Sequence, residues 1–362
     1  MQVNPPDLTQ VTPVEICEVI KPAVMPVLET DSSAGELLQP DHRKVRKSKP
    51  VIKLHVKKKR TISSGGCLRL LYLFAGVKRK SDVAHFLRSE CKKRKWELKL
   101  KEVDLLQHGK DDDVLDDKVW KGIITSVESG EWDVIFGTPP CCSFSRVQWA
   151  NNHGPRPVRS RAYPFGFPWL VGTEKKRAEV GNLLVRRTFQ AFRAGHNSPA
   201  RSRFLLEHPE DLGATKQGDL PGSIFQWEES QNLFAETGAV QGALHQCRFP
   251  GARSPKPTRL VGTFKKLNKM LYVGMPTFNK QGKYTGPLPR SCGHTDHKPL
   301  VGTQVVDGEV KFMTFGSSDY PPGMCEELAV TACEEFDSSE DDEVRPTSGE
   351  EGATARSPPL SP

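Results

Sequence analysis

A cysteine in a proline-rich loop is the residue of this sequence best placed to act as a nucleophile. Cys141 follows two consecutive prolines, which stiffen the main chain and hold the thiol in a fixed position. Residues 139–173 contain several arginines and no acidic residue. Because nearby cations favour thiolate over thiol, we expect Cys141 to be reactive. The alternative is an inert cysteine buried in a structural proline turn.

Two further residues have side chains suited to chemistry at the same place. Glu207 ends the apolar stretch 204–206, where partial burial would raise the pKa of its carboxyl and let it donate a proton near neutral pH. Arg248 follows the apolar stretch 240–245 and offers a planar fork of donors for a base or a phosphate. Alternatively, Glu207 caps a helix and Arg248 pairs with a surface acid.

Short apolar runs alternate with helical patterns and predict an α/β fold. Strands are expected at residues 68–74, 96–103, 132–136, 204–206, 259–262 and 298–300, and helices at residues 82–94, 116–127 and 174–194. The alternation of strands and helices implies right-handed crossovers. We therefore predict a doubly wound, mostly parallel, Rossmann-like sheet with helices on both faces, flanked by disordered tails.

The ends of the first two predicted strands carry residues typical of a cofactor site. Phe74 and Gly76 follow the first strand, and Asp104 follows the second. A glycine lets a ligand approach the main chain closely, and an acid at this place can bind ribose hydroxyls. The pair favours a cofactor that contains adenosine, although Asp104 could also be a helix cap.

The charge pattern divides the chain into three parts, within a net charge of +8. Residues 1–60 are predicted to be disordered and include the basic run 43–60, which suggests nuclear import, a nucleic-acid arm or a solvated linker. Residues 61–333 are predicted to fold, and residues 334–362 form an acidic tail. No apolar run approaches the roughly 18 residues of a membrane span, and the nine cysteines lack paired spacing. Membrane-spanning, secreted and collagen-like classes are therefore excluded.

A basic aromatic loop, residues 146–173, is the predicted nucleic-acid-binding segment. Its arginines can neutralise phosphates, and its aromatic rings offer stacking faces for bases. The arginines in question are Arg146, Arg156, Arg159 and Arg161. Alternatively, a loop of this composition packs over a core.

Three potential zinc ligands occur near the C-terminus, at Cys292, His294 and His297. Three ligands at loose spacing do not define a zinc site, and a fourth, such as Cys325, has no support from spacing. We therefore predict no metal site and interpret the segment as a polar loop before the strand at 298–300.

Four motifs, in the same order along residues 68–250, resemble those of the DNA cytosine-5 methyltransferases. G-T-P-P-C-C-S-F-S at residues 137–145 looks like the G-G-P-P-C-Q-x-F-S loop of that family. L-F-A-G at residues 73–76 is similar to the family's cofactor motif. Glu207 stands where the glutamate of the E-N-V motif stands, and Q-C-R at residues 246–248 resembles the start of the Q-x-R-x-R motif.

The resemblance implies methyl transfer to C5 of a cytosine flipped out of DNA. Cys141 would add to C6 of the base, which makes C5 nucleophilic enough to accept the methyl group. Glu207 would contact N3 and stabilise the charge that develops there, and Arg248 would hold O2. The implied partner is DNA in preference to RNA, and the implied location is the nucleus, otherwise the cytoplasm.

The resemblance also implies the cofactor and the extent of the domain. S-adenosylmethionine would be lined by Phe74 and Gly76, with Asp104 on its ribose. Residues 61–333 would form a Rossmann-like methyltransferase-type domain that includes the basic aromatic loop and a C-terminal extension over residues 250–333.

Departures from the family keep other functions open. Residues 77–80 read V-K-R-K where the family has a glycine pair, and His208 and Pro209 follow the glutamate in place of Asn-Val. These changes favour the alternative of a catalytically inactive nucleic-acid-binding protein with a methyltransferase-like fold. An amino-group methyltransferase is a third possibility, but its Pro-Pro loop usually continues with an aromatic residue, and here Cys141 follows.

Overall fold

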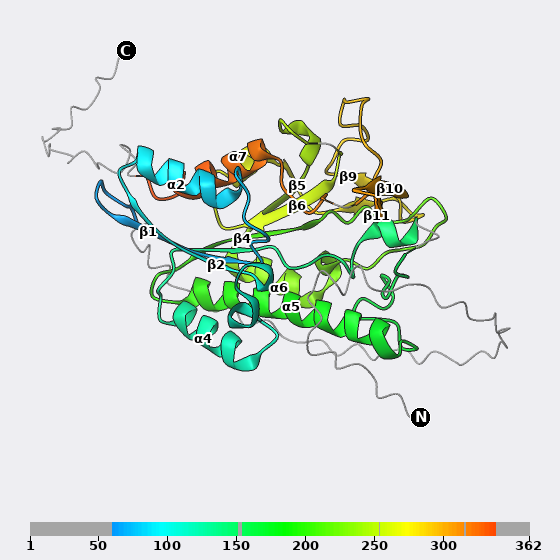
Figure 1. Cartoon of the computed structure of the whole chain (residues 1–362), viewed down its shortest axis with the longest axis horizontal. Coiled ribbons are helices and arrows are strands. Elements are labelled where there is room, and N and C mark those ends of the chain that lie inside the picture. The colour runs from blue at the N-terminus through cyan, green and yellow to red at the C-terminus, as the bar shows by residue number, and fades with distance from the viewer. Residues whose placement is uncertain (1–59, 151–153, 253, 315, 338–362) are drawn as a thin grey trace, which may run out of the picture.

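A seven-stranded sheet between two layers of helices is the main element of the fold (Figure 1). The computed structural model describes residues 60–150, 154–252, 254–314 and 316–337. The strands of the sheet are β1 (Cys67–Leu73), β2 (Glu97–Val103), β3 (Val134–Gly137), β4 (Arg203–Pro209), β5 (Val240–His245), β6 (Pro257–Gly262) and β7 (Tyr272–Val273). The α-helices are α2 (Val83–Lys93), α3 (Leu105–His108), α4 (Asp117–Glu128), α5 (Gly172–Asn197), α6 (Glu228–Thr237) and α7 (Pro322–Glu334). Two separate ribbons pair β8 (Thr277–Phe278) with β9 (Tyr284–Gly286) and β10 (Thr303–Val306) with β11 (Glu309–Phe312).

The sheet is parallel on one side and antiparallel on the other. Its strand order is β2-β1-β3-β4-β6-β5-β7, and β2, β1, β3 and β4 run parallel. β6 runs against both of its neighbours, β4 and β5, and β7 runs against β5. In the connection from β5 to β6, the described residues 246–252 and 254–256 contain no α-helix that could carry a crossover, so the two strands form an antiparallel pair. The α/β prediction is confirmed, and the sheet is mixed, with a parallel core.

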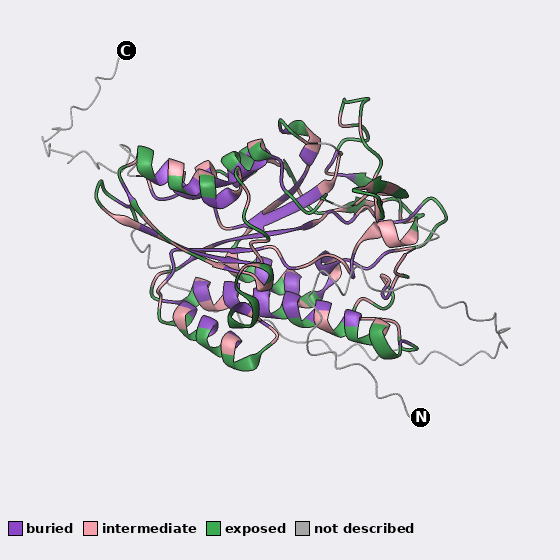
Figure 2. Cartoon of the chain, in the orientation of Figure 1, coloured by how far each residue is buried: buried purple, intermediate pink, exposed green. Residues whose placement is uncertain are grey.

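The two faces of the sheet carry separate hydrophobic cores. α2 and α7 cover one face, and α4, α5 and α6 cover the other (Figures 1 and 2). Successive side chains of a strand point to opposite faces. Leu68 and Leu70 of β1 therefore pack on the α2–α7 side, and Leu71 and Leu73 pack on the α5 side.

Most predicted elements are present, with one exception near the C-terminus. α2 begins after Asp82, whose side chain accepts a hydrogen bond from the main-chain N–H of His85. The strand expected at residues 298–300 is wrong, because the segment has no regular structure and the next strand starts at Thr303. Pro299 has no N–H to donate to a sheet, which accounts for the difference.

The predicted tails lie largely outside the described residues. This holds for residues 1–59, with most of the basic run, and for residues 338–362. Residues 334–337 do not continue as a tail, because Phe336 is buried in the core and Asp337 accepts a hydrogen bond from Arg94 at 2.8 Å. Among the helices of the described ranges, none combines the length and the apolar character that a membrane span requires.

The order of the parallel strands creates a topological switch point at β1. β1 lies between β2 and β3, so the chain leaves β1 toward one side and returns to pair with it on the other. In open α/β sheets, ligands bind at such a switch point, outside the carboxyl ends of the strands. The loop after β1 and the loop after β3 flank this point.

A fully buried ion pair joins the parallel and antiparallel parts of the sheet. The guanidinium of Arg259, in β6, donates to both carboxylate oxygens of Glu210 at 2.6 and 2.9 Å, and neither side chain is exposed. Tyr284 donates to the same carboxylate at 2.7 Å, and Arg259 also donates to the carbonyl of Gly274 at 2.8 Å. These bonds hold the end of β4, β6 and the β8–β9 ribbon together.

We expect Glu210→Ala to lower the free energy of unfolding by about 3–5 kcal/mol, because it leaves the buried Arg259 charge without its partner. Chemical denaturation of the purified chain measures this change.

The control removes an exposed ion pair that is joined by a single hydrogen bond. Arg193 and Glu236 lie 2.8 Å apart on the surface, so Glu236→Ala should cost less than about 1 kcal/mol. Equal losses of unfolding free energy in the two variants would show that the buried pair stabilises the fold no more than the exposed pair does.

Candidate active site

The loops after the parallel strands bring the predicted nucleophile and the predicted acid to one edge of the sheet. Cys141 lies in the loop after β3, and Glu207 lies within β4 rather than after it. The two groups are close enough for the carboxylate of Glu207 to raise the pKa of the Cys141 thiol. The structure therefore places a sulfur nucleophile beside a carboxyl group at the end of adjacent strands.

The thiol of Cys141 is protonated at neutral pH. Burial raises its pKa to about 11, and the negative charge of Glu207 acts in the same direction. Lys256 is the cation that opposes this shift. The expectation that the arginines of the basic aromatic loop would lower the pKa of Cys141 is therefore wrong, and the position of Arg159 explains why.

Arg159 points into the protein and holds the Cys141 loop from behind. Its side chain is only 1% exposed and donates to the carbonyl of Ser143 at 3.1 Å and to the side chain of Asn182 at 2.6 Å. Its guanidinium lies 3.9 Å from the ring centre of Phe144. The residue fastens the loop to α5, so the prediction that Arg159 binds nucleic acid is wrong.

Two other arginines of the loop are also occupied within the protein. Arg146 donates to the main-chain carbonyls of Gly213 and Ala214. Arg161 lies 3.4 Å from the carboxylate of Asp211. Both side chains therefore have partners within the protein, and that of Arg161 stays 30% exposed. Arg156 is exposed, so its side chain is accessible to a partner.

Glu207 is covered by a tyrosine from the C-terminal part of the chain. Tyr320, which precedes α7, donates its hydroxyl to Oε2 of Glu207 at 2.8 Å, and both residues are 8% exposed. Burial raises the pKa of the Glu207 carboxyl, while Lys256 and the Tyr320 hydrogen bond lower it. The shift has the direction expected from its position at the end of an apolar strand.

Lys256 and Tyr320 are the two members of this site that sequence reasoning missed. The ammonium of Lys256 lies 5.6 Å from the ring centre of Tyr320 and influences both Glu207 and Cys141. The sequence signal that could have found these two residues is the prolines next to them. Lys256 lies between two prolines, and Tyr320 is followed by two prolines, much as Cys141 is preceded by two.

The loop after β1 leaves open space beside its main chain at the switch point. Phe74 and Gly76 both have positive φ angles, +63° and +74°, a region that a residue with a side chain rarely adopts. A Cβ atom added to Gly76 would meet no atom within 4 Å. The basic residues 78–80 therefore leave the space beside the Gly76 Cα atom open, while the N–H and the carbonyl of Gly76 are bonded to Asp104 and Gln107.

Asp104 fastens the Gly76 loop to the start of α3. Its Oδ2 accepts the N–H of Gly76 at 2.8 Å, and its Oδ1 accepts the N–H of Leu106 at 2.9 Å. The alternative role as a helix cap is therefore present in the structure. Each oxygen can still accept a second hydrogen bond, so the same carboxylate fits a ribose hydroxyl.

Arg248 makes its contacts on the antiparallel side of the sheet. It donates to the main-chain carbonyl of Met270 at 2.8 Å, and its guanidinium lies 5.3 Å from the ring centre of Phe249. The structure records these contacts for Arg248 and none that joins it to the Cys141 and Glu207 pair.

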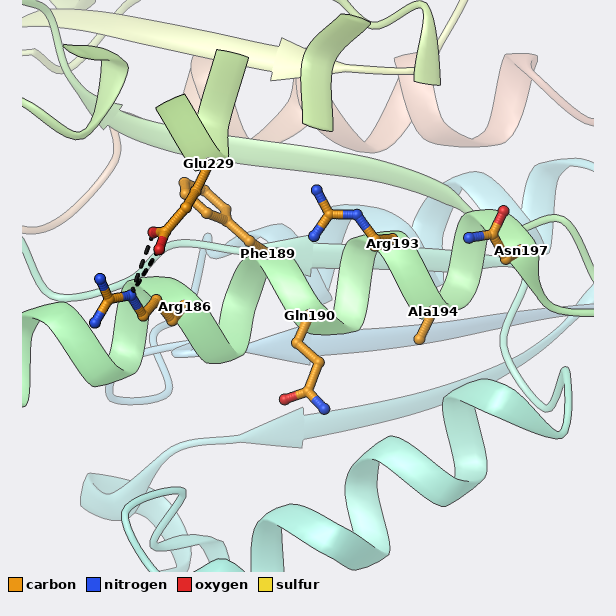
Figure 3. Close-up of a pocket in the computed structure, with 7 residues that line it drawn as sticks. All are labelled: Arg186, Phe189, Gln190, Arg193, Ala194, Asn197 and Glu229. Carbon is orange, nitrogen blue, oxygen red and sulfur yellow. Dashed lines mark hydrogen bonds and ion pairs between the residues drawn. The ribbon is translucent and has the colours of Figure 1, made fainter. Parts of the chain in front are cut away.

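A pocket of about 420 Å³ lies elsewhere, between α5 and α6 (Figure 3). It is lined by Arg186, Phe189, Gln190, Arg193, Ala194, Asn197 and Glu229. Arg186 and Glu229 form an ion pair at 3.1 Å across it. Its lining contains no nucleophile. The pocket lies along the C-terminal half of α5, near the start of β4, whereas Cys141 lies in the loop after β3.

His208 is a buried neutral histidine beside the catalytic candidates. Burial lowers the pKa of its ring to about 3, and Arg159 adds to this effect. Neither ring nitrogen has a hydrogen-bond partner in the described part of the chain, and the ring meets Phe144 edge to face at 5.1 Å. His208 therefore packs against its aromatic neighbours in a neutral form.

We expect His208 to make the fold sensitive to acid. Its pKa is about 3 in the folded state and about 6.5 when unfolded, so its contribution to stability is present above pH 6.5 and is lost as the pH falls toward 3. Between pH 7.5 and 5 the loss is about 2 kcal/mol. Chemical denaturation at pH 7.5 and at pH 5 should show that His208→Phe loses less unfolding free energy between these two pH values than the unaltered chain does.

The matched control is His85→Phe, at an exposed position of α2. It should keep the acid sensitivity of the unaltered chain. An equal loss of stability in His208→Phe and in the unaltered chain would exclude His208 as the source.

Compared with known protein families, with curated proteins and with solved structures, the chain has no match. A function is therefore inferred from the residues at this edge of the sheet: a thiol, a carboxyl of raised pKa, a lysine and an open glycine loop.

Proposed function

We propose that this chain transfers a methyl group from S-adenosylmethionine to C5 of cytosine in DNA through a covalent adduct of Cys141. The observation that carries the proposal is the pairing of Cys141 with Glu207 at the ends of adjacent strands. The strand order of the sheet also supports the proposal. As in a Rossmann-like fold, a switch point lies between β1, which leads to Gly76, and β3, which leads to Cys141.

The roles of the two side chains follow from their protonation. The Cys141 sulfur forms a bond to C6 of the base, and its proton leaves to solvent or to a neighbouring base as that bond forms. The electron pair of the C5–C6 double bond moves toward C5 and N3. Glu207, whose pKa is raised by burial, donates a hydrogen bond or a proton to N3 and stabilises this charge.

The reaction then ends with the thiol restored. S-adenosylmethionine, if bound, would supply an electrophilic methyl group to C5 and leave as S-adenosylhomocysteine. Solvent would take the proton from C5 as the Cys141 sulfur is expelled as a thiolate, which re-forms the C5–C6 double bond, and the thiolate would then regain a proton from solvent. The residues that fit the cofactor are Gly76, with open space beside its Cα atom, and Asp104, whose oxygens have remaining lone pairs.

Tyr320 is compatible with this role of Glu207. It donates to one oxygen, Oε2, so the carboxyl can present Oε1 to a base. Lys256 adds a positive charge beside both groups, which favours the thiolate of Cys141 as its proton leaves.

An exposed aromatic group supports a nucleic-acid partner. Phe167 and Trp169 stack with ring centres 4.8 Å apart, and Tyr163 packs edge to face on both. Trp169 is 64% exposed, and exposed rings of this kind can stack on bases. Arg156 is exposed in the same loop and can contact phosphate. A nuclear location agrees with a DNA substrate and with the basic run.

Two observations favour the alternative of an inactive nucleic-acid-binding protein. The thiol of Cys141 is protonated at neutral pH, and Tyr320 covers Glu207. Cofactor binding separates the two functions, because only the enzyme requires it.

We expect the purified chain to bind S-adenosylmethionine in calorimetry and to transfer labelled methyl groups to cytosine in DNA. Gly76→Trp should abolish cofactor binding by filling the open space, and Cys141→Ser should lower methyl transfer by about 10³-fold or more. Cys67→Ser is the control, since Cys67 begins β1 at the opposite edge of the sheet. No cofactor binding up to millimolar concentration would contradict the proposal and favour the inactive binding protein.

We also expect Tyr320→Phe to shift the pH dependence of methyl transfer. Its hydroxyl stabilises the ionised form of Glu207, so its removal raises the pKa of that carboxyl further. The alkaline fall in rate should therefore move to higher pH. Tyr163→Phe, on the exposed loop, is the matched control, and an unchanged fall in Tyr320→Phe would exclude Glu207 as the acid.

A further inference from the structure

Four potential metal ligands meet at the end of β5. They are Cys247, Cys292, His294 and His297, and their ligating atoms all lie within 4.8 Å of one another. The Cys292 sulfur lies 3.8 Å from Nε2 of His297. The fourth ligand is Cys247 and not Cys325, whose thiol is buried at the start of α7 near the carbonyl of Tyr320.

These separations fit a tetrahedral zinc ion. Zinc–sulfur bonds of about 2.3 Å and zinc–nitrogen bonds of about 2.0 Å place neighbouring ligand atoms about 3.3–3.8 Å apart. The four atoms need to move inward by less than about 1.5 Å to reach this geometry. Two thiolates and two neutral imidazoles also balance the charge of Zn²⁺.

The segment that supplies three of the ligands has little else to hold it in place. In residues 289–299, every residue is exposed except Cys292 and His297, and no regular structure is present. A segment folded by the hydrophobic effect would point apolar side chains inward. In this segment it is instead the thiol of Cys292 and the imidazole of His297 that point inward, toward Cys247 in the 3₁₀ turn after β5.

We propose that Cys247, Cys292, His294 and His297 bind one zinc ion that fastens residues 289–299 to the end of β5. Four protein ligands leave no open position, so the site is structural and not catalytic. Binding releases the two thiol protons to solvent. The proposal is independent of the proposed methyl transfer.

Metal analysis of the full chain tests this site. Protein purified without chelators, or loaded with zinc, should contain about one zinc per chain. Cys292→Ser and His297→Ala should each lower this content at least tenfold, whereas Cys67→Ser should not change it. Cobalt(II) added to the metal-free chain should give the intense visible absorption of a tetrahedral site and a thiolate charge-transfer band.

A second measurement does not depend on the variants folding. In the metal-free chain, trypsin should cleave after Arg290, in the exposed segment, and zinc should slow this cleavage at least tenfold. Absence of zinc together with no cobalt spectrum would overturn the proposal. A Cys247–Cys292 disulfide in protein kept under reducing conditions would overturn it as well, because it removes both sulfur ligands.

Discussion

The buried pair of Arg259 and Glu210 is the interaction on which the rest of the structure depends. It lies where a strand that runs against its neighbours joins the parallel part of the sheet, and both of its charged side chains are fully buried. Glu210 follows β4 only three residues after Glu207, so the same bond fixes the strand end that carries the proposed acid. Through Tyr284 and Gly274, it also holds the chain that continues to the proposed zinc ligands.

Proline is the second constraint that shapes the site. Cys141, Lys256 and Tyr320 come from distant parts of the chain, and each is adjacent to a pair of prolines or lies between two. A proline fixes its own φ angle and restricts the main chain of the residue before it, so the loops that carry these three residues have few main-chain conformations. The residues around Glu207 are thus carried by loops with a restricted main chain.

Local patterns in the sequence predicted the elements and the place where their ends meet, because the period of apolar residues and the order of strands determine both. The prediction that Cys141 and Glu207 lie close together rests on this order of strands. The inward turn of Arg159 could not be predicted, since it depends on acceptors in α5 and in its own loop. The reversal of β6 and the approach of Cys247 to Cys292 also depend on long-range packing, which single-chain periodicity does not contain.

Arg248 lies next to the proposed zinc site, and among the described residues its recorded contacts do not join it to the Cys141 and Glu207 pair. This residue follows Cys247 directly, so a metal bound by Cys247 would fix the turn that carries the guanidinium. Arg248 donates to the carbonyl of Met270 in the structure. To bind a base at the Cys141 site, Arg248 would have to give up this hydrogen bond; otherwise another cationic residue would have to contact the base. Lys256, which already lies beside Cys141 and Glu207, is the cation positioned to do so. Under the proposed function, Lys256 would supply the positive charge that the family resemblance assigns to Arg248.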